Sequence, residues 1–479
     1  MLFSSFEFIF AFLPVVFALY YVIHHFRFYA AAKGWLVIAS LFFYGWWNPV
    51  YLPLILISLL VNYSLGSMLL KQQKKAILLC GIVFNLGLLG YFKYTDFFIA
   101  NLNDLTSSDL VLPGIVLPLA ISFFTFQQIA YLVDSYRNET TEYSALNYML
   151  FVTFFPQLIA GPIVHHKEMM PQFERRINVS MRYKNIAVGL FIFMMGMFKK
   201  VVLADTFAQW ANAGFDSGQT LQLIDAWVTS LSYTFQLYFD FSGYSDMAIG
   251  LALLFNIHLP INFNSPYKAL SIQDFWRRWH ITLSRFLRDY VYIPLGGNRT
   301  GRYLTYQNLF LTFLIGGLWH GASWMFVIWG ALHGGALVLH RLWQTMGGRM
   351  PLLLAWFITF NFINITWVFF RAVDMTSAIN VLSGMLGLNG IALPGGLAGK
   401  FPTALNSYVQ FQDWLVVTGA TATVLPLLAG TILFTALSAN SLQIAARFKP
   451  DYRFFGLLLI FTSALFFIRE NQPFLYFDF

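Results

Sequence analysis

The chain has 479 residues, of which 58% are hydrophobic, 19% are aromatic and only 10% are charged. A soluble domain usually carries about 25% charged residues, so the composition excludes an ordinary soluble enzyme, and its apolar content excludes a disordered chain. The net charge of +8 is expected in loops between apolar segments rather than on a surface that binds nucleic acid. We therefore expect a multi-pass membrane protein.

Apolar segments that could enter a bilayer, whose core needs about 20 apolar residues per helix, recur along the whole chain. In chain order they cover residues 6–26, 35–47, 51–70, 76–92, 112–133, 146–163, 186–203, 221–257, 308–342, 351–373, 414–437 and 454–468. Residues 221–257 and 308–342 are too long for one crossing, so each could hold two helices. The sequence predicts an all-α fold in one integral-membrane domain, residues 1–479, with roughly 11–13 transmembrane helices.

Basic clusters lie at residues 71–75, 167–184, 199–200, 277–302 and 447–449, and the positive-inside rule assigns them to the cytoplasm. If all these clusters are cytoplasmic, successive loops cannot alternate strictly between the two sides of the membrane. Re-entrant and interfacial helices are therefore expected as well. Irregular backbone at membrane depth is tolerated only where protein or water shields it. A polar cavity inside the bundle is the expected consequence.

His320 is the first candidate for chemistry, because an ionisable residue inside an apolar segment is costly. Gly317 and Gly321 lie four residues apart beside it, which permits close approach of another helix or a substrate. A neutral, desolvated imidazole can act as a general base for a hydroxyl. It can equally be a buried structural side chain that bonds a carbonyl or carboxylate, and the residues alone leave both possibilities open.

Residues 273–290 combine an aromatic stripe at helical period with four arginines, and they contain a second histidine, His280. The segment fits an interfacial helix whose arginines lie near lipid phosphates. It fits equally well the wall of a pocket for an anionic donor, since guanidinium groups pair bidentately with phosphate. The candidate contacts to the donor phosphates are Arg277, Arg278, Arg285 and Arg288.

Residues 238–246 place two carboxylates, two phenols and two hydroxyls within an apolar run, where they are too polar to face lipid. They are expected to line the bundle interior, either as a structural hydrogen-bond network or as a pocket wall. The candidates are Asp240, Ser242, Tyr244 and Asp246.

The other histidines give weaker signals. His165 and His166 are expected in a solvated loop, because the next two residues are charged. His333 and His340 share a seven-residue spacing without further converging ligands, so no metal site is expected.

Together these blocks resemble the membrane-bound O-acyltransferases, specifically the bacterial branch that contains the alginate O-acetyltransferase. The resemblance rests on FDFSGYSDMA at 239–248, DFWRRWH at 274–280, RDYVYIPLGGNR at 288–299 and GLWHGASW at 317–324, with shorter matches at 124–127, 155–162 and 473–477. The most specific region is 233–343. Four such blocks in this order are far more specific than an isolated Trp-His-Gly.

The resemblance implies a helical bundle with a central tunnel, which a thioester donor enters from the cytoplasm and a hydroxyl acceptor from the other side. It implies that His320 is catalytic and that His280 is a second functional position, which orients rather than acts as the base. Further side chains assigned to the tunnel are Trp276, Trp319 and Ser323, beside the four polar residues of 238–246.

The resemblance further implies acetyl transfer from acetyl-CoA, or from an acyl carrier thioester, with no permanently bound cofactor and no metal. The acceptor would be an extracytoplasmic polysaccharide, reached directly or through an acetyl-accepting periplasmic protein of a polysaccharide-modification complex in a bacterial inner membrane. Alginate or another exopolysaccharide comes first, then peptidoglycan, and teichoic-acid D-alanylation uses the same fold. The alternative from another class is a flippase without chemistry, which inverted repeats would favour; the sequence shows no such symmetry.

Overall fold

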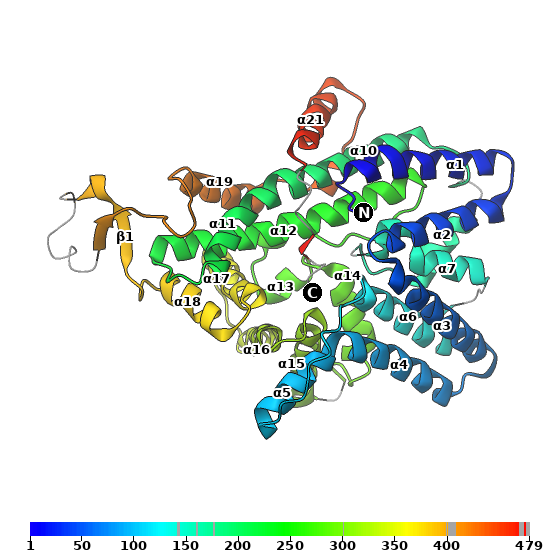
Figure 1. Ribbon diagram of the computed structural model, residues 1–479, viewed down its shortest axis with the longest axis horizontal. Helices are drawn as coiled ribbons and strands as arrows, with labels where there is room; N and C mark the ends of the chain where they lie inside the picture. The colour runs from blue at the N-terminus through cyan, green and yellow to red at the C-terminus, as the bar shows by residue number, and fades with distance from the viewer. Residues whose placement is uncertain are drawn as a thin grey trace.

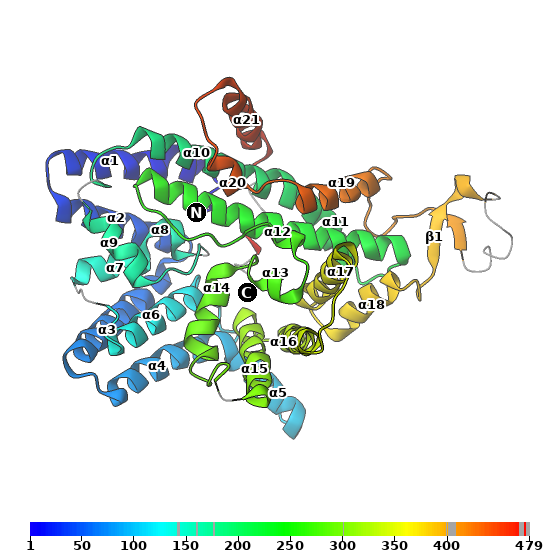
Figure 2. The same cartoon turned by 180° about the vertical axis from the view of Figure 1, so that it is seen from behind.

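The computed structural model describes residues 1–140, 144–159, 161–175, 178–299, 301–398, 400, 409–468 and 474–475. Helices dominate these residues, and they surround two short central helices, α13 (Ile272–Trp276) and α14 (Ile281–Leu287), in both views of the molecule (Figures 1 and 2). The all-α fold predicted from the sequence is confirmed. One exception is a parallel pair of short strands, β1 (Ile391–Pro394) and β2 (Val409–Gln412), which projects from one end (Figure 1).

The elements before residue 260 form the first part of the bundle. They are η1 (Glu7–Phe12), α1 (Leu13–His25), α2 (Tyr29–Gly45), η2 (Pro49–Tyr51), α3 (Leu52–Gln72), α4 (Lys75–Leu89), η3 (Gly90–Tyr94), α5 (Thr95–Thr106), α6 (Ile121–Tyr136), α7 (Ala145–Thr153), α8 (Phe155–Leu158), α9 (His166–Glu174), α10 (Tyr183–Phe198), η5 (Lys199–Ala204), α11 (Asp205–Asp216) and α12 (Leu223–Leu254). Of these, η1, η3 and η5 are π-helical turns inserted into longer helices.

The elements after residue 260 complete it. Besides α13 and α14 they are η6 (Pro266–Lys268), η7 (Arg288–Tyr292), α15 (Arg302–His320), α16 (Trp324–Thr345), α17 (Leu352–Arg371), α18 (Met375–Met385), η8 (Gly395–Leu397), α19 (Val424–Leu437), α20 (Ser441–Ala445), α21 (Tyr452–Thr462) and η10 (Ser463–Phe467).

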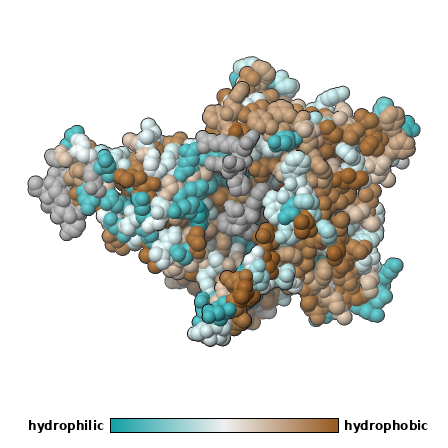
Figure 3. Space-filling view, in the orientation of Figure 1, coloured by the Kyte–Doolittle hydropathy of each residue, from teal (hydrophilic) through white to brown (hydrophobic). Residues whose placement is uncertain are grey.

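Six helical stretches of the described chain are long and apolar enough to cross a membrane. They are Glu7–His25, Pro49–Gln72, Lys75–Thr106, Tyr183–Asp216, Trp324–Thr345 and Leu352–Arg371. Apolar side chains cover much of the surface formed by α1 to α4, whereas hydrophilic patches gather nearer the strands (Figure 3). The multi-pass membrane prediction is confirmed. The predicted total of 11–13 crossings also counts shorter helices and stays a prediction.

The long segment 221–257 is one helix, so the expectation of two helices there is wrong. α12 runs for 32 residues without a break, about 48 Å at 1.5 Å per residue, and most of its side chains are buried. It packs closely along α10: a Cβ added to Gly243 would lie 2.7 Å from the carbonyl oxygen of Gly196. Small residues let the two backbones approach, and neighbouring helices rather than lipid surround the polar groups of α12.

The other long segment, 308–342, does divide into two helices, as expected. α15 ends at His320, and Gly321 and Ser323 then take extended conformations before α16 begins. A catalytic candidate therefore lies at a helix terminus, where backbone carbonyls lack helical partners.

Candidate active site

His320 lies in the aromatic interior of the bundle and not at its lipid-facing surface. Its side chain is only 3% exposed. The ring centroids of Trp329 and Phe370 are 5.1 and 5.2 Å from its imidazole, and that of Trp319 is 5.0 Å away. These rings exclude lipid and bulk water from the imidazole.

His280 comes from a different segment and lies next to His320. The two imidazole centroids are 6.4 Å apart, and His280 is fully buried. It occupies the position before α14 in a left-handed conformation, with φ of 43°, which is rare for a residue with a side chain and is typical of functional sites. The fold therefore brings together the two histidines that the sequence singled out.

Asn262 determines how the His280 ring is protonated. Its Oδ1 atom accepts hydrogen bonds from the backbone N–H of Thr282 at 3.3 Å and from the Thr282 hydroxyl at 2.9 Å. Because a backbone N–H can only donate, the atom that faces it must be the amide oxygen. His280 Nδ1 lies 3.1 Å from the same oxygen, so it carries the proton. In the neutral ring Nε2 then carries no proton and cannot donate to an oxyanion, which favours an orienting role for His280.

Replacing Asn262 by leucine is expected to lower acyl transfer about 10- to 100-fold, because His280 loses the acceptor that fixes its tautomer. The matched control is Ser245→Ala, which removes only the weak partner of the amide nitrogen, at 3.4 Å. Turnover of both variants in purified membranes, with the thermal midpoint as a check on folding, tests this. Equal rates in the two variants would contradict the assignment.

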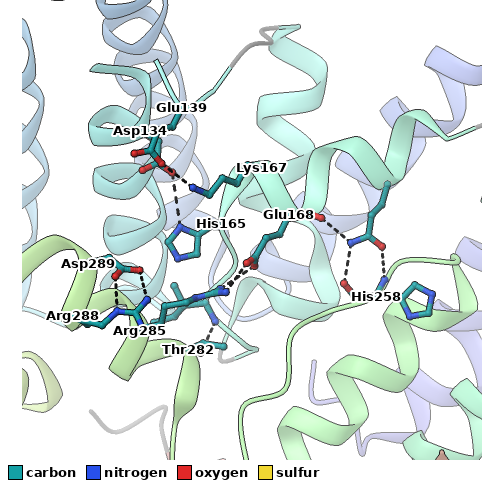
Figure 4. Close-up of polar contacts among 12 residues, drawn as sticks. Asp134, Glu139, His165, Lys167, Glu168, His258, Thr282, Arg285, Arg288 and Asp289 are labelled. Atoms are coloured by element: carbon teal, nitrogen blue, oxygen red, sulfur yellow. Dashed lines mark hydrogen bonds and ion pairs between the residues drawn. The ribbon is translucent and has the colours of Figure 1, made fainter. Parts of the chain in front are cut away.

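Three of the four predicted phosphate-binding arginines are engaged by carboxylates of this chain. The pairs are Arg278–Asp274, Arg285–Glu168 and Arg288–Asp289, at 2.8, 2.6 and 2.7 Å (the last two in Figure 4). Arg285 binds both oxygens of Glu168, the geometry that a phosphate would need. Occupied guanidinium groups are poor candidates for donor contacts.

Arg277 differs from the other three, because it has no ion pair within the described residues and lines a cavity of about 350 Å³. Arg341 and His340 lie on the same cavity, and Trp276 forms part of its wall. The full lining is Gln273, Trp276, Arg277, Ser284, Leu309, Phe313, Leu337, His340, Arg341 and Gln344.

Aromatic contacts lead from this cavity to the histidines. The ring centroid of Trp276 is 5.8 Å from that of Trp329, and Trp329 in turn is 5.1 Å from His320. One pair of indole rings in contact thus connects the wall of the basic cavity with the buried imidazole.

The sequence profile of the membrane-bound O-acyltransferase family matches residues 119–379, more than half of the chain. The chain belongs to this family. It is 55% identical to the peptidoglycan O-acetyltransferase of Helicobacter pylori, over 82% of this chain and 81% of that protein. It is 44% identical to a protein of Pseudomonas aeruginosa named "Probable alginate O-acetylase AlgI", over 80% of this chain and 75% of that one. A teichoic acid D-alanyltransferase of Streptococcus thermophilus is 27% identical over 53% of this chain and 68% of its own.

The protein is therefore an acyltransferase, which excludes the alternative of a flippase without chemistry. The family profile includes both His280 and His320, and also the basic cavity between α13 and α16.

In this O-acyltransferase the carboxylates of 238–246 belong to an ion-pair network. Lys200 of η5 lies 2.7 Å from Asp205 and 2.9 Å from Asp240, and Lys199 lies 2.6 Å from Asp246. The sequence assigned both lysines to a cytoplasmic cluster, which stays a prediction; the structure shows that Lys200 is only 6% exposed and is paired inside the bundle. Of the two possibilities left open for Asp240 and Asp246, the structure shows the network.

The remaining tunnel candidates have mixed surroundings. Tyr244 stacks on Phe474 near the C-terminus, with ring centroids 4.4 Å apart, and Ser242 is buried. Trp319 is next to His320 and stacks on Phe126 at 5.0 Å. Ser323 begins α16. Of the terminal match at 473–477, positions 473, 476 and 477 lie outside the described residues.

His165 and His166 are buried, so their placement in a solvated loop is wrong. The charged residues after them point outward, whereas His165 Nδ1 lies 3.0 Å from the hydroxyl of Tyr290. That hydroxyl donates to Asp134 Oδ1 at 2.7 Å, close to His165 in Figure 4. Burial and the Asp134 carboxylate raise the pKa of the Tyr290 phenol well above its usual value, which keeps it a donor.

Sequence reasoning missed two residues of this site. Asn262 gives no signal, because nothing in the sequence places an asparagine between segments beside His280. Lys93, whose ammonium bonds the backbone carbonyls of Trp319 and His320, gives a signal that was missed. The predicted span 76–92 ended one residue before it, whereas the apolar helical stretch continues to Thr106. An ionisable residue inside a span is a functional candidate by default.

Proposed function

We propose that this acyltransferase is an O-acetyltransferase of a bacterial cytoplasmic membrane, which transfers acetyl groups from acetyl-CoA to hydroxyls of peptidoglycan outside the cytoplasm. The observation that carries the proposal is the buried pair His320 and His280, with imidazole centroids 6.4 Å apart, beside a basic cavity. A desolvated imidazole is suited to take a proton from a hydroxyl.

The choice of acceptor changes from the expectation of the sequence. An exopolysaccharide such as alginate came first there, with peptidoglycan next. The relative named a peptidoglycan O-acetyltransferase is 55% identical to this chain, against 44% for the one named an alginate O-acetylase, and the two alignments cover similar shares. This difference favours peptidoglycan, and alginate becomes the alternative outcome of the test.

In the proposed reaction His320 accepts the proton of the acceptor hydroxyl while that oxygen attacks the carbonyl carbon of the thioester. The tetrahedral intermediate collapses as the carbon–sulfur bond breaks, and His320 returns the proton to the leaving thiolate. The products are an acetyl ester and CoA with a free thiol. General acid–base assistance of this kind contributes about 10²- to 10⁴-fold in rate.

The donor side of the proposal rests on the basic cavity. Arg277 and Arg341 offer two guanidinium groups there, and CoA carries several phosphate charges. Arg277 on the cavity wall begins the basic segment 277–302, which the positive-inside rule assigns to the cytoplasm. A highly charged donor cannot cross lipid, so we place the phosphates of CoA at the cavity and only its thioester end near His320.

The proposal predicts transfer across the membrane in inside-out vesicles. Vesicles from cells that produce the protein would hold peptidoglycan fragments or alginate oligomers in the lumen, and labelled acetyl-CoA would be added outside. Native vesicles retain any periplasmic protein through which transfer proceeds. We expect labelled ester on the lumenal peptidoglycan fragments and release of free CoA thiol outside, at rates well above those of vesicles without the protein.

Three results would count against the proposal. Label on alginate alone would overturn the acceptor. Activity with an acyl carrier thioester but not with acetyl-CoA would overturn the donor. Release of CoA without any lumenal ester would show that the hydroxyl acceptor is water and would overturn transfer to a polysaccharide.

A further inference from the structure

The C-terminal end of α15 lacks the capping hydrogen bonds that usually pair the last carbonyl groups of a helix. Helices commonly end in a left-handed residue whose N–H folds back to an earlier carbonyl. Gly321 is instead extended, with φ of −162° and ψ of 153°, and its N–H makes only a long bond of 3.4 Å to Gly317. The carbonyls of the last turn, which carries His320, therefore need donors from elsewhere.

Two consecutive residues of η3 supply these donors. The ammonium of Lys93 donates to the carbonyl oxygens of Trp319 at 2.7 Å and His320 at 3.0 Å. The Tyr94 hydroxyl donates to the carbonyl of Leu318 at 2.5 Å. Three successive carbonyls at the end of α15 are thus held by one neighbouring segment.

The surroundings of Lys93 fit this role in detail. Its third hydrogen is directed to the hydroxyl of Ser122 at 3.2 Å, so an ammonium with three donors meets three acceptors. A cation at a helix C-terminus also interacts favourably with the helix dipole. The side chain comes from a π-helical turn within the apolar stretch Lys75–Thr106, and such turns are frequent at functional sites.

A charge at this depth is costly, and no carboxylate of the described chain pairs with Lys93. The hydrogen bonds of its ammonium go instead to the backbone around His320 and to Ser122. The Lys93 ammonium therefore stabilises the C-terminal end of α15.

We infer that Lys93, assisted by Tyr94, is a positioning residue that holds the last turn of α15 and so fixes where the His320 imidazole lies. The inference rests on the proposed function for its catalytic consequence. A displacement of about 1 Å in a catalytic group can cost about 10²-fold in rate. Lys93 itself need not touch either substrate.

The test compares Lys93→Met, which keeps the length and removes the donors, with Lys93→Arg, which keeps the charge. We expect Lys93→Met to lower kcat about 10²-fold while KM for the donor stays within about threefold, since binding is not its role. Lys93→Arg should recover at least about tenfold of that loss. Lys71→Met, an exposed lysine at the end of α3, is the matched control and should behave as wild type.

Hydrogen exchange of a peptide that covers residues 317–322 gives a readout independent of catalysis. Lys93→Met should exchange faster there than wild type, and the rest of the bundle should not. If Lys93→Met does not fold, Tyr94→Phe, which removes only the bond to Leu318, should still raise exchange in the same peptide and lower kcat a few-fold.

The outcomes separate this inference from the proposed function. Unchanged exchange in both variants, or a Lys93→Met enzyme with wild-type kcat, would overturn the positioning role even if His320 proves essential. Faster exchange at 317–322 together with an active His320→Ala enzyme would uphold the positioning of the helix end and overturn the proposed role of His320.

Discussion

Replacing His320 by alanine is expected to abolish measurable acetyl transfer while the protein still inserts into the membrane. The aromatic rings packed around it cannot take a proton from a hydroxyl, and we assign the neighbouring His280 an orienting role. Loss of general acid–base assistance alone lowers the rate about 10²- to 10⁴-fold. Release of CoA thiol in the vesicle assay, normalised to the amount of protein in the membrane, measures the effect.

Two further variants make the His320 result specific. His320→Gln keeps hydrogen bonding but cannot carry the proton, so it should be as inactive as the alanine variant. His25→Ala, at an exposed histidine of α1, should retain full activity. Wild-type turnover in His320→Ala would remove His320 from the mechanism, and the assignment by resemblance would then have to move to His280.

Much of the fold follows from the sequence because apolar length is a local property. Residues 51–70 and 351–373 match α3 and α17 within a few residues. The prediction of two helices in segment 221–257 failed because other helices surround α12. The helix length that a bilayer allows therefore does not limit it. Apolar residues alone also fail to locate helix ends. α6 begins at Ile121, nine residues inside the predicted segment 112–133.

The sequence predicted the site residues that belong to a motif. It did not predict contacts that depend on residues far apart in the chain. His280 and His320 came from two blocks of the resemblance, and they lie side by side. Arg285 could not be assigned correctly, because its partner Glu168 is 117 residues away in the chain. The tautomer of His280 and the contacts of Lys93 likewise depend on contacts between distant segments, which no local pattern encodes.

Replacing Lys200 by methionine is expected to destabilise the protein strongly. The ammonium lies between the carboxylates of Asp205 and Asp240, at 2.7 and 2.9 Å, and all three side chains are at least nine-tenths buried. Removing one partner of a buried ion pair costs about 3–5 kcal/mol, because a charge remains without compensation. A marked fall in the thermal midpoint of the detergent-solubilised protein, followed by the fraction that stays monodisperse, measures this loss.

A further variant tests whether Lys200→Met loses stability through an uncompensated charge or through lost packing. In the triple variant Lys200→Met, Asp205→Asn and Asp240→Asn no buried charge is left over, so most of the lost stability should return, even though no ion pair is restored. Lys167→Met removes a pair with Glu139 whose side chains are 51% and 41% exposed, and there we expect a change below about 1 kcal/mol. If the triple variant is as unstable as the single one, the network between η5 and α12 stabilises the bundle through packing, and the uncompensated charge is not the cause.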